Sequence, residues 1–233
     1  MIRNFIKMLL PPIILNLLKF LRKKLKKKKF LAQKTKTQSL DIYFDKEMAE
    51  ILEIWGAKSV WIEIQHFLLG KKGKILDIAC GTGKVAEILS KKLNMHEVYG
   101  CDVSSLLIDK AVERGISKDK LKVSDATNLQ YDDNYFDYCY SIGSLEHFTE
   151  EGINKFLISS KNVTKYIGYH MVPVSKSNKD EGWVTDEYQS YFNNSEEWWR
   201  EKCSKVFDKV VILDSSWESS ESNQVGKWLI LSK

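Results

Sequence analysis

The stretch from Lys74 to Ala86 constrains the fold of this chain more than any other. Its apolar run from Ile75 to Cys80 has the length of one buried strand, and glycines at positions 81 and 83 end that run. Apolar residues then recur at helical spacing, at Val85, Ala86, Ile88 and Leu89. The pattern predicts a strand, a tight turn and a helix. Because glycines permit positive φ and a helix start carries unpaired N–H groups, the turn is a candidate ligand site.

An acidic residue before the turn helps to decide which ligand the turn binds. Gly81 and Gly83 also fit a dinucleotide fingerprint, so an NAD-dependent oxidoreductase is one alternative. Asp77, however, lies in the same strand four residues before Gly81, and we expect it to face the crevice. Its carboxylate would repel a pyrophosphate and attract a cation, and S-adenosylmethionine carries two cationic groups. A P-loop is excluded, because Ile78 stands where the first glycine should be and Val85 follows the lysine.

Three further motifs follow in order along the chain. The segment 98–102 predicts a second strand that ends in Asp102, 21 residues after Gly81, where a ribose-binding carboxylate is expected. The others are 123–126 and 136–148. With 76–83, these motifs resemble those of class I S-adenosylmethionine-dependent methyltransferases, and the resemblance covers about residues 70–233. It implies an α/β fold with a Rossmann-like seven-stranded sheet, helices on both faces, and S-adenosylmethionine as cofactor.

The resemblance also implies which residues hold the cofactor. Asp102 is expected at the ribose and Asp125 beside the adenine. The full expected set is Asp77, Ala79, Gly81, Gly83, Asp102, Val103, Asp125, Ala126 and Ser141.

Two residues after the fourth predicted strand are the candidates for catalysis. His147 lies at the carboxyl edge of the sheet, where ligands of open α/β sheets bind, and can take a proton from a hydroxyl acceptor. Glu146 is expected to orient the imidazole or to bind substrate, and a purely structural turn is the alternative. His170 is a further candidate, or a packed core residue. Some relatives hold a divalent metal with Glu-x-x-Glu-His, but Gly143 takes the first position here, so we expect no metal.

The remaining pattern alternates helices with strands and so predicts a parallel sheet. Hydrophobic spacing predicts two helices within residues 37–69, one that covers the crevice, with Ile51, and one that packs on the sheet, with Ile62. Ser104 or Ser105 is suited to cap one helix, and Thr149 is suited to cap another. Further strands are expected at 121–123, 166–174, 210–213 and 228–231, with a loop from Ser215 to Gly226.

Residues 183–199 are dense in aromatic side chains, including Trp183, Tyr191 and Trp198. Their rings can form a lid that stacks on a sugar or nucleotide, or they can shield the edge of the sheet. Both alternatives stay open.

Charge is distributed unevenly along the 233 residues. Residues 1–40 hold twelve Lys and Arg and no acid, so the remainder carries 24 basic and 31 acidic residues, or −7 against +5 overall. We expect a basic amphipathic tail at 1–36 and a catalytic domain at 37–233. The apolar run at 8–18 is too short to span a bilayer, and residues 1–30 are typical of a helix on an anionic membrane surface. Packing on another subunit is the alternative, and nucleic-acid binding is disfavoured because aromatic residues only flank the basic run.

Four cysteines without a Cys-x-x-Cys pair indicate reduced thiols and a cytoplasmic location, peripheral at the inner membrane if the tail binds lipid. The chain as a whole is similar to methyltransferases of bacterial surface-polysaccharide pathways. This likeness implies O-methylation of a sugar or a nucleotide- or lipid-linked sugar. A cofactor-binding scaffold without catalysis, held at the membrane, is the alternative of a different class.

Overall fold

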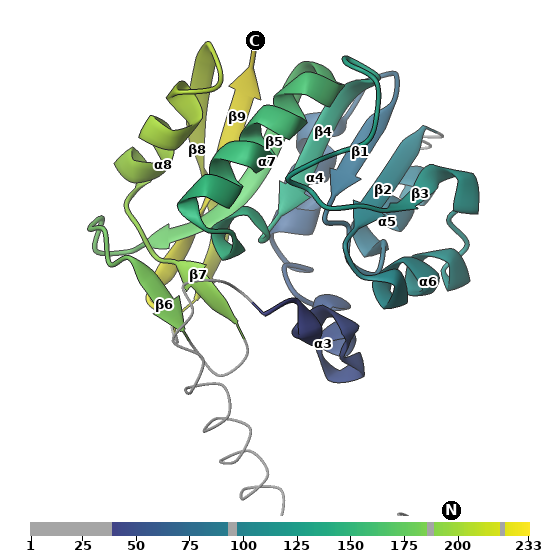
Figure 1. Cartoon of the computed structure of the whole chain (residues 1–233), viewed down its shortest axis with the longest axis horizontal. Helices are drawn as coiled ribbons and strands as arrows, with labels where there is room; N and C mark the ends of the chain where they lie inside the picture. Colours follow the sequence, from purple (N-terminus) through teal and green to yellow (C-terminus); the bar gives the residue numbers. More distant parts are fainter. Residues whose placement is uncertain (1–38, 93–96, 186–188, 220–221) are drawn as a thin grey trace, which may run out of the picture.

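A computed structural model describes residues 39–92, 97–185, 189–219 and 222–233, so the expected tail lies outside the described residues. One mixed sheet of seven strands forms the centre, in the order β3-β2-β1-β4-β5-β9-β8 (Figure 1). The pairs among β1 to β5 are parallel, and β9 runs antiparallel to both β5 and β8. The strands are β1 (Ile75–Ile78), β2 (Val98–Asp102), β3 (Leu121–Val123), β4 (Phe136–Ile142), β5 (Thr164–Ser175), β8 (Lys209–Ser219) and β9 (Gln224–Ser232). The predicted α/β class and seven-stranded sheet are confirmed.

Helices cover both faces of this sheet because its central strands are apolar on both sides. In β1, Leu76 and Ile78 join a core with α7 and α8, whereas Ile75 joins a second core with α4 and α5. The larger helices are α4 (Val60–Leu68), α5 (Lys84–Lys92), α6 (Ser105–Glu113), α7 (Glu150–Val163) and α8 (Glu196–Ser204). The alternation along β1 follows from the period of two in a strand.

Hydroxyl side chains begin three of these helices, as the sequence predicts for Ser104 and Thr149. The oxygen of Ser104 accepts from Leu107 N, that of Thr149 from Gly152 N, and that of Ser195 from Trp198 N. Each bond satisfies an N–H group that the first turn of the helix leaves unpaired.

The predicted loop from Ser215 to Gly226 is wrong. Strand β8 continues to Ser219 and β9 already begins at Gln224, with an irregularity in β8 between Asp214 and Glu218. Ser215 lies within that irregularity, and its hydroxyl donates to Glu63 of α4 at 2.7 Å. Glu63 also accepts from Trp228 Nε1 on β9 at 2.6 Å. Strand β5 also starts at Thr164, two residues before the prediction, because α7 runs into it without a glycine turn.

The residues before α4 form a separate layer, which we call the cap, residues 40–55. It comprises the 3-10 helix η1 (Leu40–Phe44), α3 (Lys46–Leu52) and the turn that follows. Ile51 is exposed rather than packed over the crevice, and on α4 Ile62 is exposed rather than packed on the sheet. Gly56 joins the cap to α4 with φ +77°, and a Cβ there would lie 2.3 Å from Val60 Cγ2.

A two-stranded sheet, β6 (Trp183–Thr185) with β7 (Ser190–Phe192), lies beside the main sheet. Its aromatic rings pack on one another: Phe192 contacts Trp183 and Trp198, and Trp199 is fully buried. No helix in the described part of the chain has the length and hydropathy needed to cross a bilayer.

Candidate functional site

The turn after β1 is held in a conformation that favours glycine. Ala79, Gly81 and Gly83 all have positive φ, at 57°, 55° and 73°. A Cβ on Gly83 would lie 2.7 Å from the Ala111 Cβ, so α6 packs against this glycine directly. A Cβ on Gly81 would lie 3.7 Å from Leu52 Cδ1, an ordinary contact distance, so this glycine faces the cap across the crevice. Ala79 is a strained non-glycine residue, a feature that clusters at ligand sites.

Asp77 is a buried acid that lies below this turn. It is 4% exposed, and one of its oxygens accepts a hydrogen bond of 2.7 Å from the Tyr140 hydroxyl. Burial raises the pKa of Asp77 to about 8, the Tyr140 bond lowers it and the charge of Asp102 raises it further. A cationic ligand in the crevice would relieve this penalty, because an opposite charge favours the ionised form.

Asp102 at the end of β2 binds the backbone on both sides of the same crevice. Its two oxygens accept from Gly81 N and from Ser104 N, each at 2.9 Å. Burial raises the pKa of Asp102, although these N–H groups counteract the rise. A carboxylate oxygen has more than one acceptor position, so Asp102 can still accept from hydroxyl groups. The two acids therefore suit a ligand that carries a cation and hydroxyls, as S-adenosylmethionine does.

The cap closes over this set of residues, which we call the glycine-turn site: Asp77, Ala79, Gly81, Gly83 and Asp102. The cavity at this site measures about 60 Å³; Asp77, Ala79 and Gly81 line it from the turn, and Leu52 and Trp55 line it from the cap side. Ligand pockets usually measure roughly 300 Å³ or more. A ligand of cofactor size would therefore extend beyond this cavity or displace Leu52 and Trp55.

Other residues expected at the cofactor are placed differently. Asp125 is exposed, and its carboxylate accepts from Thr127 N and Oγ1 at 2.8 Å. Val103 is half-buried beside Asp102, and Ala126 is buried in the core shared with α7. The Ser141 hydroxyl is fully buried and bonds to His170 Nδ1 at 2.9 Å, so its side chain points into the core.

His170 is also a core residue. Burial lowers its pKa to about 3, and its ring packs edge-on to Phe156. The structure therefore keeps this histidine neutral and away from the glycine-turn site.

A second group of polar residues surrounds η3 (Leu145–His147), which follows β4. His147 Nδ1 lies 2.8 Å from the Ser190 carbonyl oxygen on β7. A carbonyl can only accept, so Nδ1 carries the hydrogen and Nε2 is the basic nitrogen of the neutral ring. Nε2 lies 3.6 Å from Glu146 Oε1. The side chains of His147 and Glu146 thus lie within 3.6 Å of one another, and the hydrogen bond to Ser190 on β7 fixes the orientation of the imidazole.

Glu146 is buried, with 3% exposure, and its Oε2 has no hydrogen-bond partner among the described residues. Burial raises the pKa of Glu146 to about 8. A buried polar oxygen without a partner is costly, and such groups are common where a ligand supplies the missing donor.

Tyr43 of the cap connects the two groups. Its carbonyl accepts from the Ser104 hydroxyl at 2.7 Å, and its own hydroxyl accepts from Gln189 Nε2 at 3.3 Å. We call Tyr43, Glu146, His147, Gln189 and Ser190 the His147 site. Sequence reasoning missed Gln189 and Ser190, because no motif marks a side chain or carbonyl that becomes adjacent only on folding.

No cluster of three or more His, Cys, Asp or Glu in the described ranges has an arrangement that could hold a metal ion. The thiols of Cys101, Cys139 and Cys203 are free and buried, and Cys80 is half-buried near the glycine turn.

Comparison with known proteins agrees with this geometry. Residues 75–168 match a family described as a methyltransferase domain. "Probable tRNA methyltransferase 9B" of Homo sapiens is 29% identical over 72% of this chain, and the chain spans 32% of that protein. The chain therefore spans about a third or less of the curated relatives that head this comparison.

Two solved structures share the fold. A SAM-dependent methyltransferase from Methanosarcina mazei has a TM-score of 0.56 and 19% identity, covering 73% of this chain and 96% of the other. The 1,6-didemethyltoxoflavin-N1-methyltransferase of Burkholderia thailandensis, solved with bound S-adenosylhomocysteine, has a TM-score of 0.55 and 15% identity, covering 79% and 86%. With its glycine turn, its acid after β2 and its sheet order, this chain has the fold of the class I S-adenosylmethionine-dependent methyltransferases and carries a methyltransferase domain at residues 75–168.

Proposed function

We propose that this protein transfers a methyl group from S-adenosylmethionine to a hydroxyl of a small-molecule acceptor. The finer proposal is O-methylation of a sugar, or a nucleotide- or lipid-linked sugar, of surface-polysaccharide synthesis. The observation that carries the reaction type is the pair of His147 and Glu146. A histidine with a defined basic nitrogen lies beside a buried acid at the carboxyl edge of the sheet, and Oε2 of this acid has no hydrogen-bond partner among the described residues.

The glycine-turn site would hold the cofactor. Asp77 would pair with its ammonium group and Asp102 would accept from its ribose hydroxyls. Gly81 leaves room for the cofactor to approach the backbone, and Val103, Asp125 and Ala126 would lie toward the adenine. Ser141 would contribute through its backbone, because its hydroxyl is bonded to His170. When bound, S-adenosylmethionine supplies an electrophilic methyl carbon on a positively charged sulfur.

The His147 site would supply the proton chemistry. Nε2 of His147 would take the proton of the acceptor hydroxyl as its oxygen receives the methyl group that bound S-adenosylmethionine supplies. Ser190 holds the ring through Nδ1, and the ionised form of Glu146 would stabilise the resulting positive charge from 3.6 Å.

The composition of the His147 site favours an uncharged acceptor. Its five residues include an acid and several neutral hydrogen-bonding groups, and none is Lys or Arg. A phosphate at the reacting end would therefore lack a cationic partner in this set, whereas sugar hydroxyls can both donate to Glu146 and accept from Gln189. The sugar assignment also relies on the likeness to surface-polysaccharide methyltransferases.

Peripheral binding to an anionic inner membrane through residues 1–30, in a cytoplasmic protein, is part of this proposal. It relies on the twelve basic residues within 1–40 and the apolar run at 8–18. The chain without residues 1–30 should no longer sediment with phosphatidylglycerol vesicles that sediment the full chain. Equal sedimentation of the two forms would refute membrane binding through the tail.

An RNA acceptor is the second candidate, favoured by the likeness to a protein named as a tRNA methyltransferase. The basic tail could contact phosphates, but the rest of the chain carries a net charge of −7, which would repel them.

The test is an acceptor screen with radiolabelled S-adenosylmethionine. The panel should contain nucleotide sugars, free deoxysugars, phosphoethanolamine and bulk tRNA. Label in an O-methyl sugar would support the proposal. Label only in tRNA would favour the second candidate, and label only in an amine would refute O-methylation.

A further inference from the structure

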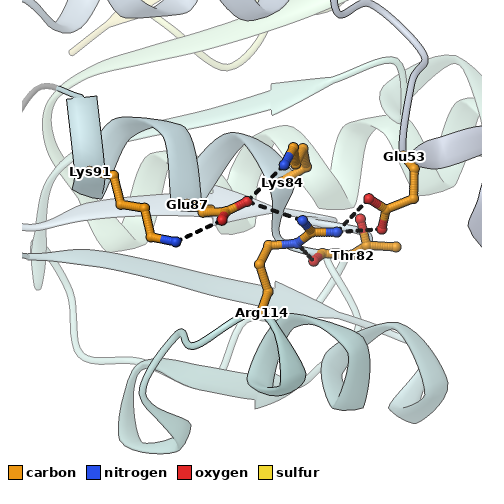
Figure 2. Close-up of polar contacts among 6 residues, drawn as sticks. All are labelled: Glu53, Thr82, Lys84, Glu87, Lys91 and Arg114. Atoms are coloured by element: carbon orange, nitrogen blue, oxygen red, sulfur yellow. Dashed lines mark hydrogen bonds and ion pairs between the residues drawn. The ribbon is translucent and has the colours of Figure 1, made fainter.

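Arg114 connects three separate parts of the chain beside the glycine-turn site. It follows α6, and Figure 2 shows its guanidinium between Glu87 and Glu53, above Thr82. Its Nε donates to the Thr82 carbonyl oxygen at 3.0 Å, and Nη1 donates to Glu87 at 3.0 Å. Its Nη2 lies 2.5 Å from both oxygens of Glu53. One side chain thus bonds the glycine turn, α5 and the cap at once.

The position of Glu53 gives this contact a consequence for the cofactor pocket. Glu53 lies between Leu52 and Trp55, the two cap residues that line the 60 Å³ cavity. Arg114 therefore joins the cap on one side of the cavity to Thr82 of the glycine turn on the other side. The fork of an arginine can serve several acceptors in fixed directions, which a lysine ammonium cannot reproduce.

The carboxylates that Arg114 contacts differ in their other partners. Glu87 on α5 also accepts hydrogen bonds from Lys84 and Lys91, each at 2.9 Å, so its negative charge stays paired even without Arg114 (Figure 2). Although partial burial opposes ionisation, the hydrogen bond from Arg114 lowers the pKa of Glu53. The Glu53 carboxylate is 34% exposed, so water can replace Arg114 when this bond opens.

The cap is held to the rest of the chain at both of its ends. At one end the Tyr43 carbonyl is bonded to Ser104, and at the other Gly56 precedes α4. Helix α4 itself is tied to β8 and β9 through Glu63. Between these points, the Arg114–Glu53 contact joins the cap to the glycine turn.

We propose that Arg114 is a positioning residue that latches the cap over the cofactor pocket. Its contact with Glu53 opens when the cofactor enters or leaves, while its bonds to Thr82 and Glu87 keep the turn in place. The proposal rests on the cofactor assignment made under the proposed function.

Stopped-flow binding of S-adenosylhomocysteine to the full chain tests the latch. Tryptophan fluorescence is a suitable signal because Trp55 lines the cavity. Glu53→Gln should speed both association and dissociation, dissociation on the order of fivefold, the scale of a partly exposed ion pair. Glu50→Gln, an exposed acid of α3, is the matched control and should keep wild-type rates. Arg114→Lys should speed dissociation and also weaken affinity, because the bond to Thr82 is lost as well.

Melting temperatures of all variants separate the latch from general destabilisation. Faster exchange in Glu53→Gln at an unchanged melting temperature supports the proposal. Wild-type rates in Glu53→Gln and Arg114→Lys would overturn the latch alone, since the ligand still binds. No binding of S-adenosylhomocysteine by the wild type would overturn the cofactor assignment, and the latch with it.

Discussion

The glycine-turn site and the His147 site are built in opposite ways. Four of the five residues of the first lie within Asp77 to Gly83, and Asp102 follows on the adjacent strand β2. The second combines Tyr43, η3 and two residues next to or on β7, which folding brings together from distant parts of the chain. A site made of one local motif can be recognised from sequence and is shared widely. A site assembled from distant loops can vary, and it is where the substrate is chosen.

The largest effect that separates the two sites is expected at His147. In His147→Ala, turnover should fall by about 10²- to 10⁴-fold, the usual contribution of a general base. Affinity for S-adenosylhomocysteine should not change, because the residue lies outside the glycine-turn site. The measurements are label transfer to the acceptor from the screen and calorimetric titration.

His66→Ala is the control for this prediction, since His66 is exposed on α4 and should leave turnover unchanged. Full activity in His147→Ala would remove the proposed base. Cofactor binding without turnover on any acceptor, in the wild type as well, would favour the scaffold alternative.

Alanine substitutions of the two glycines of the turn should have the next largest effect, which is on the free energy of unfolding. Gly83→Ala adds a Cβ 2.7 Å from the Ala111 Cβ at φ +73°, and should cost about 2 to 4 kcal/mol of unfolding free energy. Gly81→Ala meets only Leu52 at 3.7 Å, and should cost about 1 kcal/mol from its φ alone. Urea denaturation measures both, and equal costs would contradict the packing described for Gly83.

Both sites contain an acid with a raised pKa, and this predicts the pH dependence of stability. The folded-state pKa of Asp77 and of Glu146 is about 8, above the unfolded value near 4. The contribution of these two acids to stability is therefore complete below pH 4, where both are protonated, and it is lost as the pH rises toward 8. The free energy of unfolding should fall between pH 5 and 8.5, by on the order of 1 kcal/mol per pH unit for each acid, and the melting temperature should fall with it.

Asp77→Asn sharpens this prediction, because an amide does not ionise. The variant should lose less stability than the wild type between pH 5 and 8.5, and should bind S-adenosylhomocysteine weakly. The ligand should stabilise the wild type more at pH 8.5 than at pH 6, since its cation pairs with the ionised Asp77. A stability that does not depend on pH would contradict the burial of these acids.

The smallest effect distinguishes two helix caps. Ser104→Ala and Thr149→Ala should each cost about 1 kcal/mol of stability. Only Ser104→Ala should also weaken S-adenosylhomocysteine binding, because it removes the hydroxyl that bonds to the Tyr43 carbonyl of the cap. Calorimetry on both variants checks this, and equal ligand affinities would show that the link through Ser104 does not affect the pocket.

Local patterns predicted most of the fold because local physics determines it. The strand, turn and helix at Lys74 to Ala86 follow from hydrophobic period and glycine position, and the caps at Ser104 and Thr149 follow from unpaired N–H groups. The predicted loop at 215–226 failed for a tertiary reason. Its polar residues extend β8 and β9 and, at Ser215, bond to Glu63 of α4, which no local pattern reveals.

The candidate sites show the same limit. Asp77 was predicted to face the crevice, but its hydrogen bond to Tyr140, 63 positions away, joins two separate motifs and follows from neither of them. Ser141 belongs to a family motif, yet its hydroxyl points to His170, because alternate residues of β4 face opposite sides of the sheet. Arg114 follows α6 with no sequence signal and contacts Glu53 only in the folded chain.

The most direct test of the cofactor site is calorimetric titration of S-adenosylhomocysteine into the wild type and Asp102→Ala, with NAD as the control ligand. We expect binding to the wild type, no binding of NAD, and a loss of about 1 to 3 kcal/mol in Asp102→Ala, the scale of a lost charged hydrogen bond. Equal affinity in the two proteins, binding of NAD in place of S-adenosylhomocysteine, or no binding at all would contradict the assignment of the glycine-turn site.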